Sequence, residues 1–150
     1  MQSVSIKYLD FLDLESIRPL TELHYQEITT DKEIKKLSPH LSIYEAMAEN
    51  KNMICLYAYS GDRCIGYSIN FVYPLLHYRE TISVENDLIF VHPDFRGEKI
   101  GELLIKETEK KAIEAGAHLI LWHAKDGSKL DSMFKDNGYK VQDVIYGRAL

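Results

Sequence analysis

Residues 88–104, LIFVHPDFRGEKIGELL, decide the fold class. The apolar run at 88–91 predicts a strand that is covered on both faces. After the loop at 92–97, the apolar residues Ile100, Leu103 and Leu104 lie on one side of a helix that extends to about residue 115. A buried strand, a short loop and an amphipathic helix in this order predict a layered α/β protein.

Further strands and helices are expected on both sides of this segment. Helices are predicted at 13–28, at 42–48 with a Ser42/Glu45 capping box, and at 128–137. Strands are predicted at 3–9, 53–59, 65–73, 81–91, 119–122 and 139–147. Antiparallel strands therefore come early in the chain, and one strand–helix–strand crossover comes late.

The two cysteines flank a predicted hairpin turn at Gly61-Asp62. A two-residue loop pairs Cys55 with Ser68, so that Cys55 and Cys64 do not face each other. We therefore expect no disulfide between them.

Composition and charge exclude several classes of protein. With 150 residues, 45% hydrophobic and 27% charged, the chain has the make-up of one ordinary globular domain. The net charge of −5 opposes binding to nucleic acid or to anionic lipid. The sequence has neither an apolar run long enough to cross a bilayer nor the start of a signal peptide, so we expect a cytoplasmic protein without a membrane partner.

The start of the helix in residues 88–104 has the features of an anion site. Arg96 and Lys99 supply positive charge, and Gly97 and Gly101 permit close approach to the unpaired amides at the helix start. A tight turn with surface charges is the alternative interpretation. The sequence has no GxxxxGK[ST] and no GxGxxG after the first strand, which argues against a P-loop or a Rossmann site.

The segment resembles the GNAT superfamily of acyl-CoA N-acyltransferases. The family motif [QR]-x-x-G-x-[GA] reads Arg96-Gly97-Glu98-Lys99-Ile100-Gly101, with Lys99 where the middle glycine is usual. The run Val91, Pro93, Phe95, the strand at 119–122 and Gly138-Tyr139 follow in family order. The spacing of HYQEI, LLHYRE, ENDLIFVHPDFRG, LWHAK and GYKVQDVIY is similar to that of GNAT proteins encoded by phages and prophages.

The resemblance implies a fold and a co-substrate. The fold is a single GNAT-like domain over residues 1–150, with a mixed, mostly antiparallel sheet of six to seven strands, a splay between two central strands and about four flanking helices. The co-substrate is acetyl-CoA, with its pyrophosphate on the helix start and its pantetheine arm on the main chain of the preceding strand. The implied cofactor-binding residues are Ile89, Phe90, Val91, Arg96, Gly97, Glu98, Lys99, Ile100 and Gly101.

Two carboxylates are the candidates for proton transfer. Amide formation requires an uncharged amine, whereas an alkylammonium has a reference pKa near ~10.4. Asp87 and Glu85 lie two residues apart on the predicted strand and share a face near the splay. We therefore assign them as catalytic, with Asp87 as first choice, and the alternative is a solvated pair at a strand edge.

Five residues are the candidates for the acceptor pocket: His24, Glu27, His77, Tyr78 and His123. His24 and Glu27 are three residues apart on a helix face that should turn inward, so they either pair with each other or line the cavity. His123 directly follows a buried strand and either relays a proton or is a satisfied strand-end histidine. No HExxH or comparable spacing predicts a metal site.

Two departures from the family pattern carry consequences. Many GNAT enzymes have a tyrosine that protonates the departing CoA thiolate, and the matching position here is Phe134. Tyr139 and Tyr146 are either its stand-ins or ordinary strand aromatics. Only about 12 residues follow Gly138, which leaves one sheet edge open, so we expect a homodimer.

The predicted function is transfer of an acetyl group from acetyl-CoA to a primary amine of a small molecule or a protein, by direct attack. One alternative, motivated by Lys99 and Phe134, is a GNAT-like module that binds CoA or a partner protein with little activity. A second alternative is a nucleotide-binding α/β domain of another kind.

Overall fold

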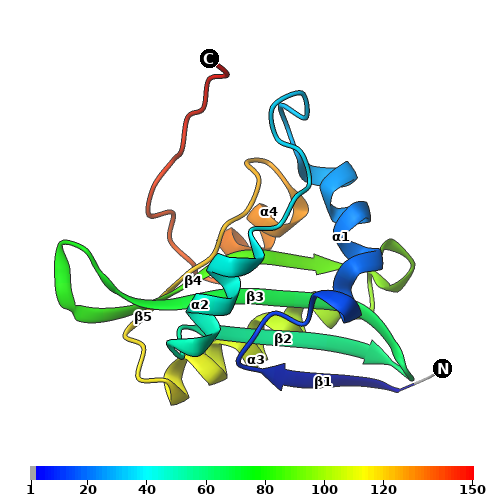
Figure 1. Ribbon diagram of the computed structural model, residues 1–150, viewed down its shortest axis with the longest axis horizontal. Helices are drawn as coiled ribbons and strands as arrows, with labels where there is room; N and C mark the ends of the chain where they lie inside the picture. The colour runs from blue at the N-terminus through cyan, green and yellow to red at the C-terminus, as the bar shows by residue number, and fades with distance from the viewer. Residues whose placement is uncertain (1–2) are drawn as a thin grey trace.

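The computed structural model describes residues 3–150. Its centre is a sheet of five strands in the order β1-β2-β3-β4-β5 (Figure 1). The first four strands pair antiparallel, and β5 pairs parallel with β4. The late strand–helix–strand crossover is therefore confirmed. The strands are β1 (Val4–Leu9), β2 (Met53–Ser60), β3 (Arg63–Leu75), β4 (Tyr78–Val91) and β5 (Leu119–Leu121).

Helices cover both faces of the sheet. One apolar cluster joins Ile17 of α1 and Met47 of α2 to the sheet, and a second joins Leu104 of α3 to the opposite face. The four helices are α1 (Leu14–Ile28), α2 (Leu41–Glu49), α3 (Ile100–Glu114) and α4 (Lys129–Asp136). None of the helices within residues 3–150 has the length and apolar character that a bilayer crossing requires.

Helix α2 begins earlier than the sequence pattern predicts. Its N-cap is His40, which makes no side-chain capping bond, and the Ser42 hydroxyl is hydrogen-bonded to His40 Nδ1 at 3.1 Å. Because Ser42 lies inside the first turn, it does not act as the capping residue. The predicted Ser42/Glu45 capping box is wrong.

The β2–β3 hairpin has the expected turn but a shifted register. One extra residue of β3 is inserted between the pairs Tyr59–Cys64 and Ala58–Gly66, so Cys55 pairs with Ile69 and not with Ser68. The predicted register is wrong from this β-bulge onward, because a bulge displaces all later pairs by one residue. Cys55 and Cys64 are both buried and free.

The expected strand at 139–147 is not formed within the described chain. Residues 140–150 are exposed and have no strand pairing, and they lead away from the sheet in Figure 1. A strand is stable only when it pairs and buries one face, and this segment does neither. The sheet of residues 3–150 therefore has five strands, and the prediction of six to seven is wrong.

Candidate functional site

Strands β4 and β5 separate part-way along β4. Their parallel pairing ends at Glu85 and Leu121, whereas β4 continues to Val91. The His92 N–H donates to β3 at 2.8 Å, so the main-chain groups of Ile89 and Val91 point to the other side, from which β5 has diverged. This opening lies where the resemblance places the splay.

Two carboxylates of β4, Glu85 and Asp87, lie at a β-bulge of this strand. The β3–β4 register jumps from Asn86 to Leu88, so Asp87 is the inserted residue. The Asn86 amide bridges the bulge by donating to Leu88 O at 3.0 Å. Asp87 turns towards α2, where the Tyr44 hydroxyl donates to Asp87 Oδ2 at 2.9 Å. Glu85 and Asp87 therefore share a face beside the opening, as expected.

Glu85 is bonded to side chains from both neighbouring strands. His123, just after β5, places Nε2 at 2.8 Å from Glu85 Oε1, and the Tyr73 hydroxyl of β3 donates to Glu85 Oε2. Because a carboxylate accepts from Nε2–H, the neutral imidazole has its free lone pair on Nδ1. The pair Glu85–His123 thus joins the two sides of the opening and orients a proton-accepting nitrogen.

The surroundings of Asp87 raise the pKa of its carboxyl group. Desolvation raises the pKa of Asp87 above its ordinary value, and the charge of Glu85 acts in the same direction. The hydrogen bond from Tyr44 and the nearby His123 oppose this rise. Asp87 still reaches solvent, so it can take up a proton at the site and release it to water.

The start of α3 forms an open turn. Gly97 has φ 90° and the N-cap Lys99 has φ 61°, the left-handed conformation that glycine favours. Lys99 therefore keeps the backbone shape that a glycine would adopt, at the cost of some strain. A Cβ added at Gly97 would meet no atom within 4 Å, so the turn that precedes the helix is open at this residue.

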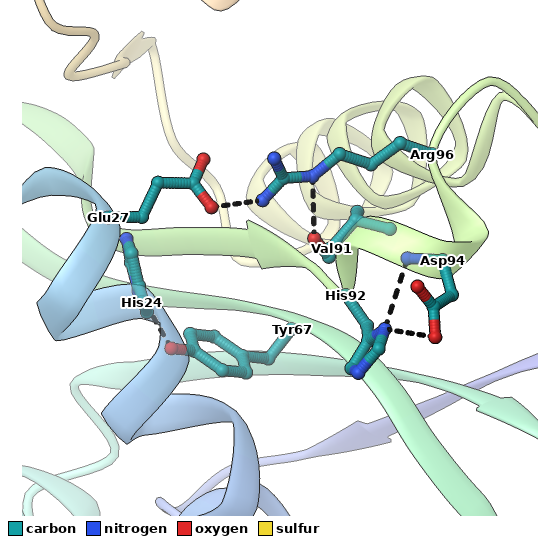
Figure 2. A network of polar contacts seen from close by, with 7 residues as sticks. All are labelled: His24, Glu27, Tyr67, Val91, His92, Asp94 and Arg96. Atoms are coloured by element: carbon teal, nitrogen blue, oxygen red, sulfur yellow. Dashed lines mark hydrogen bonds and ion pairs between the residues drawn. The ribbon is translucent and has the colours of Figure 1, made fainter.

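The Arg96 side chain is bound by the protein itself (Figure 2). Its guanidinium forms an ion pair with Glu27 of α1 at 2.7 Å, and its Nε donates to Val91 O at 2.9 Å. The same group lies over the Phe90 ring at 5.2 Å. Arg96 therefore ties α1 to the end of β4, and the exposed Lys99 is the cation at the helix start that remains directed to solvent.

His24 and Glu27 do not pair with each other, although they are neighbours on α1. The His24 Nδ1 and the Tyr67 hydroxyl are hydrogen-bonded at 2.7 Å, and the imidazole stacks on Phe90 with ring centroids 4.7 Å apart. His24 is 5% exposed, and its burial lowers its pKa to about 4. Of the two alternatives for these residues, the pairing of His24 with Glu27 is not formed, because His24 bonds to Tyr67 and Glu27 bonds to Arg96.

His77 and Tyr78 lie away from the opening. They are exposed residues at the turn between β3 and β4. At about 3.3 Å per residue, the seven residues from Tyr78 to Glu85 span about 23 Å of strand. The structure brings His123 to the carboxylates but does not bring these two residues there.

Phe134 occupies a buried aromatic cluster. Its ring lies 5.7 Å from Trp122 and 4.8 Å from Tyr139, measured between centroids. The Tyr139 hydroxyl donates to Glu109 of α3, and desolvation raises its pKa. Tyr146 is 91% exposed in the C-terminal segment. The Tyr139 hydroxyl is therefore already hydrogen-bonded to a residue of α3.

Two residues of the site were missed by sequence reasoning, Tyr44 and Tyr73. Each donates a hydrogen bond to one of the carboxylates. Tyr44 is 43 residues from Asp87 in the chain, and Tyr73 is 12 residues from Glu85. No local spacing carries such a signal, because the contacts depend on how α2 and β3 pack against β4.

Residues 16–139 match the model of the acetyltransferase (GNAT) family. The chain belongs to this family. No curated sequence matches this GNAT chain.

Solved structures share the GNAT fold over nearly the whole chain. An aminoglycoside acetyltransferase from an uncultured soil metagenomic sample has a TM-score of 0.76 at 13% identity, with 99% of each chain covered. The ribosomal-protein-alanine N-acetyltransferase of Brucella melitensis biovar Abortus 2308 has a TM-score of 0.69 at 20% identity, again with 99% of each chain covered. An aminoglycoside N-acetyltransferase in complex with CoA has a TM-score of 0.73 at 17% identity, covering 99% of this chain and 96% of its own.

Proposed function

We propose that this GNAT chain transfers an acetyl group from acetyl-CoA to a primary amine by direct attack, as a single cytoplasmic domain over residues 1–150. The observation that carries the proposal is the gathering of Asp87, Glu85 and His123 beside the unpaired edge of β4. Structural neighbours that are named as acetyltransferases of aminoglycosides and of ribosomal-protein alanine support the amine acceptor. The likeness to phage- and prophage-encoded GNAT proteins belongs to the same proposal.

The residues present fit acetyl-CoA, which supplies the activated acetyl thioester. The first N–H groups of α3 have no acceptor within the helix, and they follow the open turn at Gly97, a combination that suits a pyrophosphate. The main chain of Ile89 and Val91 offers hydrogen bonds to an extended arm and can polarise a carbonyl oxygen. Arg96 contributes by holding the Val91 carbonyl, which fixes the end of the strand.

The side chains at the opening provide a path for the proton. An ammonium acceptor must first lose a proton, and Asp87 together with His123 Nδ1 receives it and passes it to water. The amine nitrogen then forms a bond to the acetyl carbon and the carbon–sulfur bond breaks. The nitrogen loses one further proton to solvent, and the thiolate takes one proton from solvent. Glu85 positions His123 through the 2.8 Å contact, and the negative charge of both carboxylates attracts a cationic acceptor.

Release of free thiol from acetyl-CoA with a panel of primary amines tests the proposal. We expect Asp87→Asn and His123→Ala to lower turnover by roughly 10²- to 10⁴-fold, the usual contribution of general acid–base catalysis. The affinity for acetyl-CoA, measured by calorimetry, should not change in these variants. Glu85→Gln weakens the contact that positions His123 and should also lower turnover. Its matched control is Glu80→Gln, at an exposed position of the same strand, which should keep wild-type turnover.

Three outcomes separate the candidate functions. Thiol release that depends on Asp87 and His123 supports the transferase. Heat of binding with acetyl-CoA but no thiol release with any amine would instead support a CoA-binding module, for which the buried Phe134 is the structural argument. No heat with acetyl-CoA would overturn both assignments.

A further inference from the structure

The two carboxylates beside the opening differ in how many of their oxygens are already bonded. Glu85 accepts at both oxygens, from His123 Nε2 at Oε1 and from the Tyr73 hydroxyl at Oε2. Asp87 accepts from the Tyr44 hydroxyl at Oδ2, at 2.9 Å, and forms no other side-chain hydrogen bond within the described chain. Asp87 Oδ1 is therefore the carboxylate oxygen that is left to take up a proton, and Tyr44 is the group that fixes the direction of this carboxylate.

The Tyr44 hydroxyl is held in place by the packing of its ring. Tyr44 lies on α2 and packs against the apolar cluster on that side of the sheet, with its ring centroid 6.1 Å from that of Phe71 in β3. Burial raises the pKa of Tyr44 above its ordinary range, and the charge of Asp87 and the hydrogen bond to it act in the same direction. The phenol therefore keeps its proton at neutral pH and donates it to the carboxylate.

Tyr44 has the largest effect among the groups that favour the charged form of Asp87. Its hydrogen bond lowers the pKa of Asp87 more than the nearby histidine does, whereas desolvation and the neighbouring carboxylate raise it. Besides Tyr44, four titratable groups of β2, β3, β4 and the segment after β5 interact electrostatically with Asp87, namely Cys55, Tyr67, Glu85 and His123. Burial is the main cause that raises the pKa of the thiol and of the Tyr67 phenol, so both are uncharged at neutral pH.

We propose that Tyr44 is a positioning residue that keeps the Asp87 carboxylate charged and turned towards the opening. A hydrogen bond donated to a carboxylate stabilises its charged form, and such a bond is stronger than one between neutral groups. Helix α2 thereby prepares the group that receives the proton of the ammonium acceptor. The inference rests on the proposed function, but the control of Asp87 by Tyr44 is measurable without turnover.

The titration of Asp87 tests this control directly. The carbon NMR signal of its side-chain carboxyl group, assigned by comparison with Asp87→Asn, gives the midpoint of protonation. Tyr44→Phe retains the ring but removes the donor, so we expect the midpoint to rise by roughly one pH unit. The matched control is Tyr25→Phe, which removes a hydroxyl that donates to Lys35 O and should not change the midpoint. An unchanged midpoint in Tyr44→Phe would overturn the inference.

Turnover shows whether Tyr44 acts through Asp87. With acetyl-CoA and the same panel of primary amines, Tyr44→Phe should lower the kcat of thiol release by roughly tenfold. The affinity for acetyl-CoA, measured by calorimetry, should stay at the wild-type value. In the Asp87→Asn background the same change should have no further effect, because the group that Tyr44 positions is already absent. Equal losses in the two backgrounds would show that Tyr44 contributes only to packing, which contradicts the inference.

The two measurements separate this inference from the proposed function. A raised midpoint in Tyr44→Phe, together with wild-type turnover of Asp87→Asn, would support the control of Asp87 by Tyr44 and refute the proposed path of the proton. An unchanged midpoint, together with a strongly reduced turnover of Asp87→Asn, would refute the role of Tyr44 and leave the path of the proton intact.

Discussion

Acidification should destabilise the protein through His24. This imidazole is buried between Tyr67 and Phe90, and its pKa is lowered from 6.5 to about 4, chiefly by burial. Nearby Arg96 contributes to the lowering, and Glu27 opposes it. As the pH falls below 6.5, the unfolded chain binds a proton at His24 while the folded chain does not, so the free energy of unfolding decreases.

The magnitude follows from the two pKa values. A difference of one pKa unit corresponds to about 1.4 kcal/mol, so the lowering of the His24 pKa to about 4 removes roughly 3 kcal/mol between neutral pH and pH 4. Domains of this size are commonly stable by about 5–15 kcal/mol. The loss is therefore a large part of the total and is measurable well before the protein unfolds.

Urea unfolding at a series of pH values between about 7.5 and 4 measures this loss. Over this range the free energy of unfolding of the wild type should fall by roughly 3 kcal/mol more than that of His24→Asn, which does not titrate there. His77→Asn makes the same change at an exposed site and should follow the wild type. Parallel curves for the wild type and His24→Asn, or a midpoint near 6.5 for the His24 ring in NMR, would refute the reasoning.

Three further changes have expected effects on stability. Gly66→Ala places a Cβ 2.9 Å from Phe90 O, so its free energy of unfolding in urea should fall by about 1–3 kcal/mol. Asp13→Ala removes the side chain that caps α1 and should cost about 1 kcal/mol in the same measurement. Asp87→Asn should unfold at a higher temperature than the wild type at neutral pH and at the same temperature below about pH 3.8, because desolvation raises the pKa of Asp87 and makes its ionisation unfavourable in the folded state. A lower melting temperature for Asp87→Asn at neutral pH would contradict that cause.

The elements predicted well from sequence are those with local signals. The predicted helix starts at residues 13 and 128 are confirmed, because Asp13 and Ser128 cap α1 and α4 and a capping side chain bonds to an N–H only a few residues away. The predicted hairpin register was wrong at Cys55. The bulge depends on how the two strands pair, so the sequence of either strand alone does not indicate it. The prediction of a strand at 139–147 was wrong for a related reason. These residues have the composition of a strand, but they pair with no other strand of the described chain.

The candidate site was predicted in part. Period-two alternation correctly placed Glu85 and Asp87 on one face, although the bulge ends that alternation directly after Asp87. The inward direction of His24 was also correct, but its partner Tyr67 is 43 residues away and no spacing rule identifies it. The prediction that His77 lines the acceptor pocket was wrong, because the sequence around a histidine at a turn does not indicate whether that turn approaches the site.

The opening beside β4 is bordered by peptide groups, which nearly all residue types carry alike. Replacing a side chain there leaves the amide hydrogens and carbonyl oxygens where they are, so this border tolerates wide divergence, in keeping with a fold shared at 13–20% identity. In the proposed mechanism the half of the opening that bears Glu85, Asp87 and His123 has no such tolerance, because that mechanism depends on these side chains. An effort to redirect the protein towards a new amine should therefore vary the surroundings of the carboxylates and leave residues 89–101 untouched.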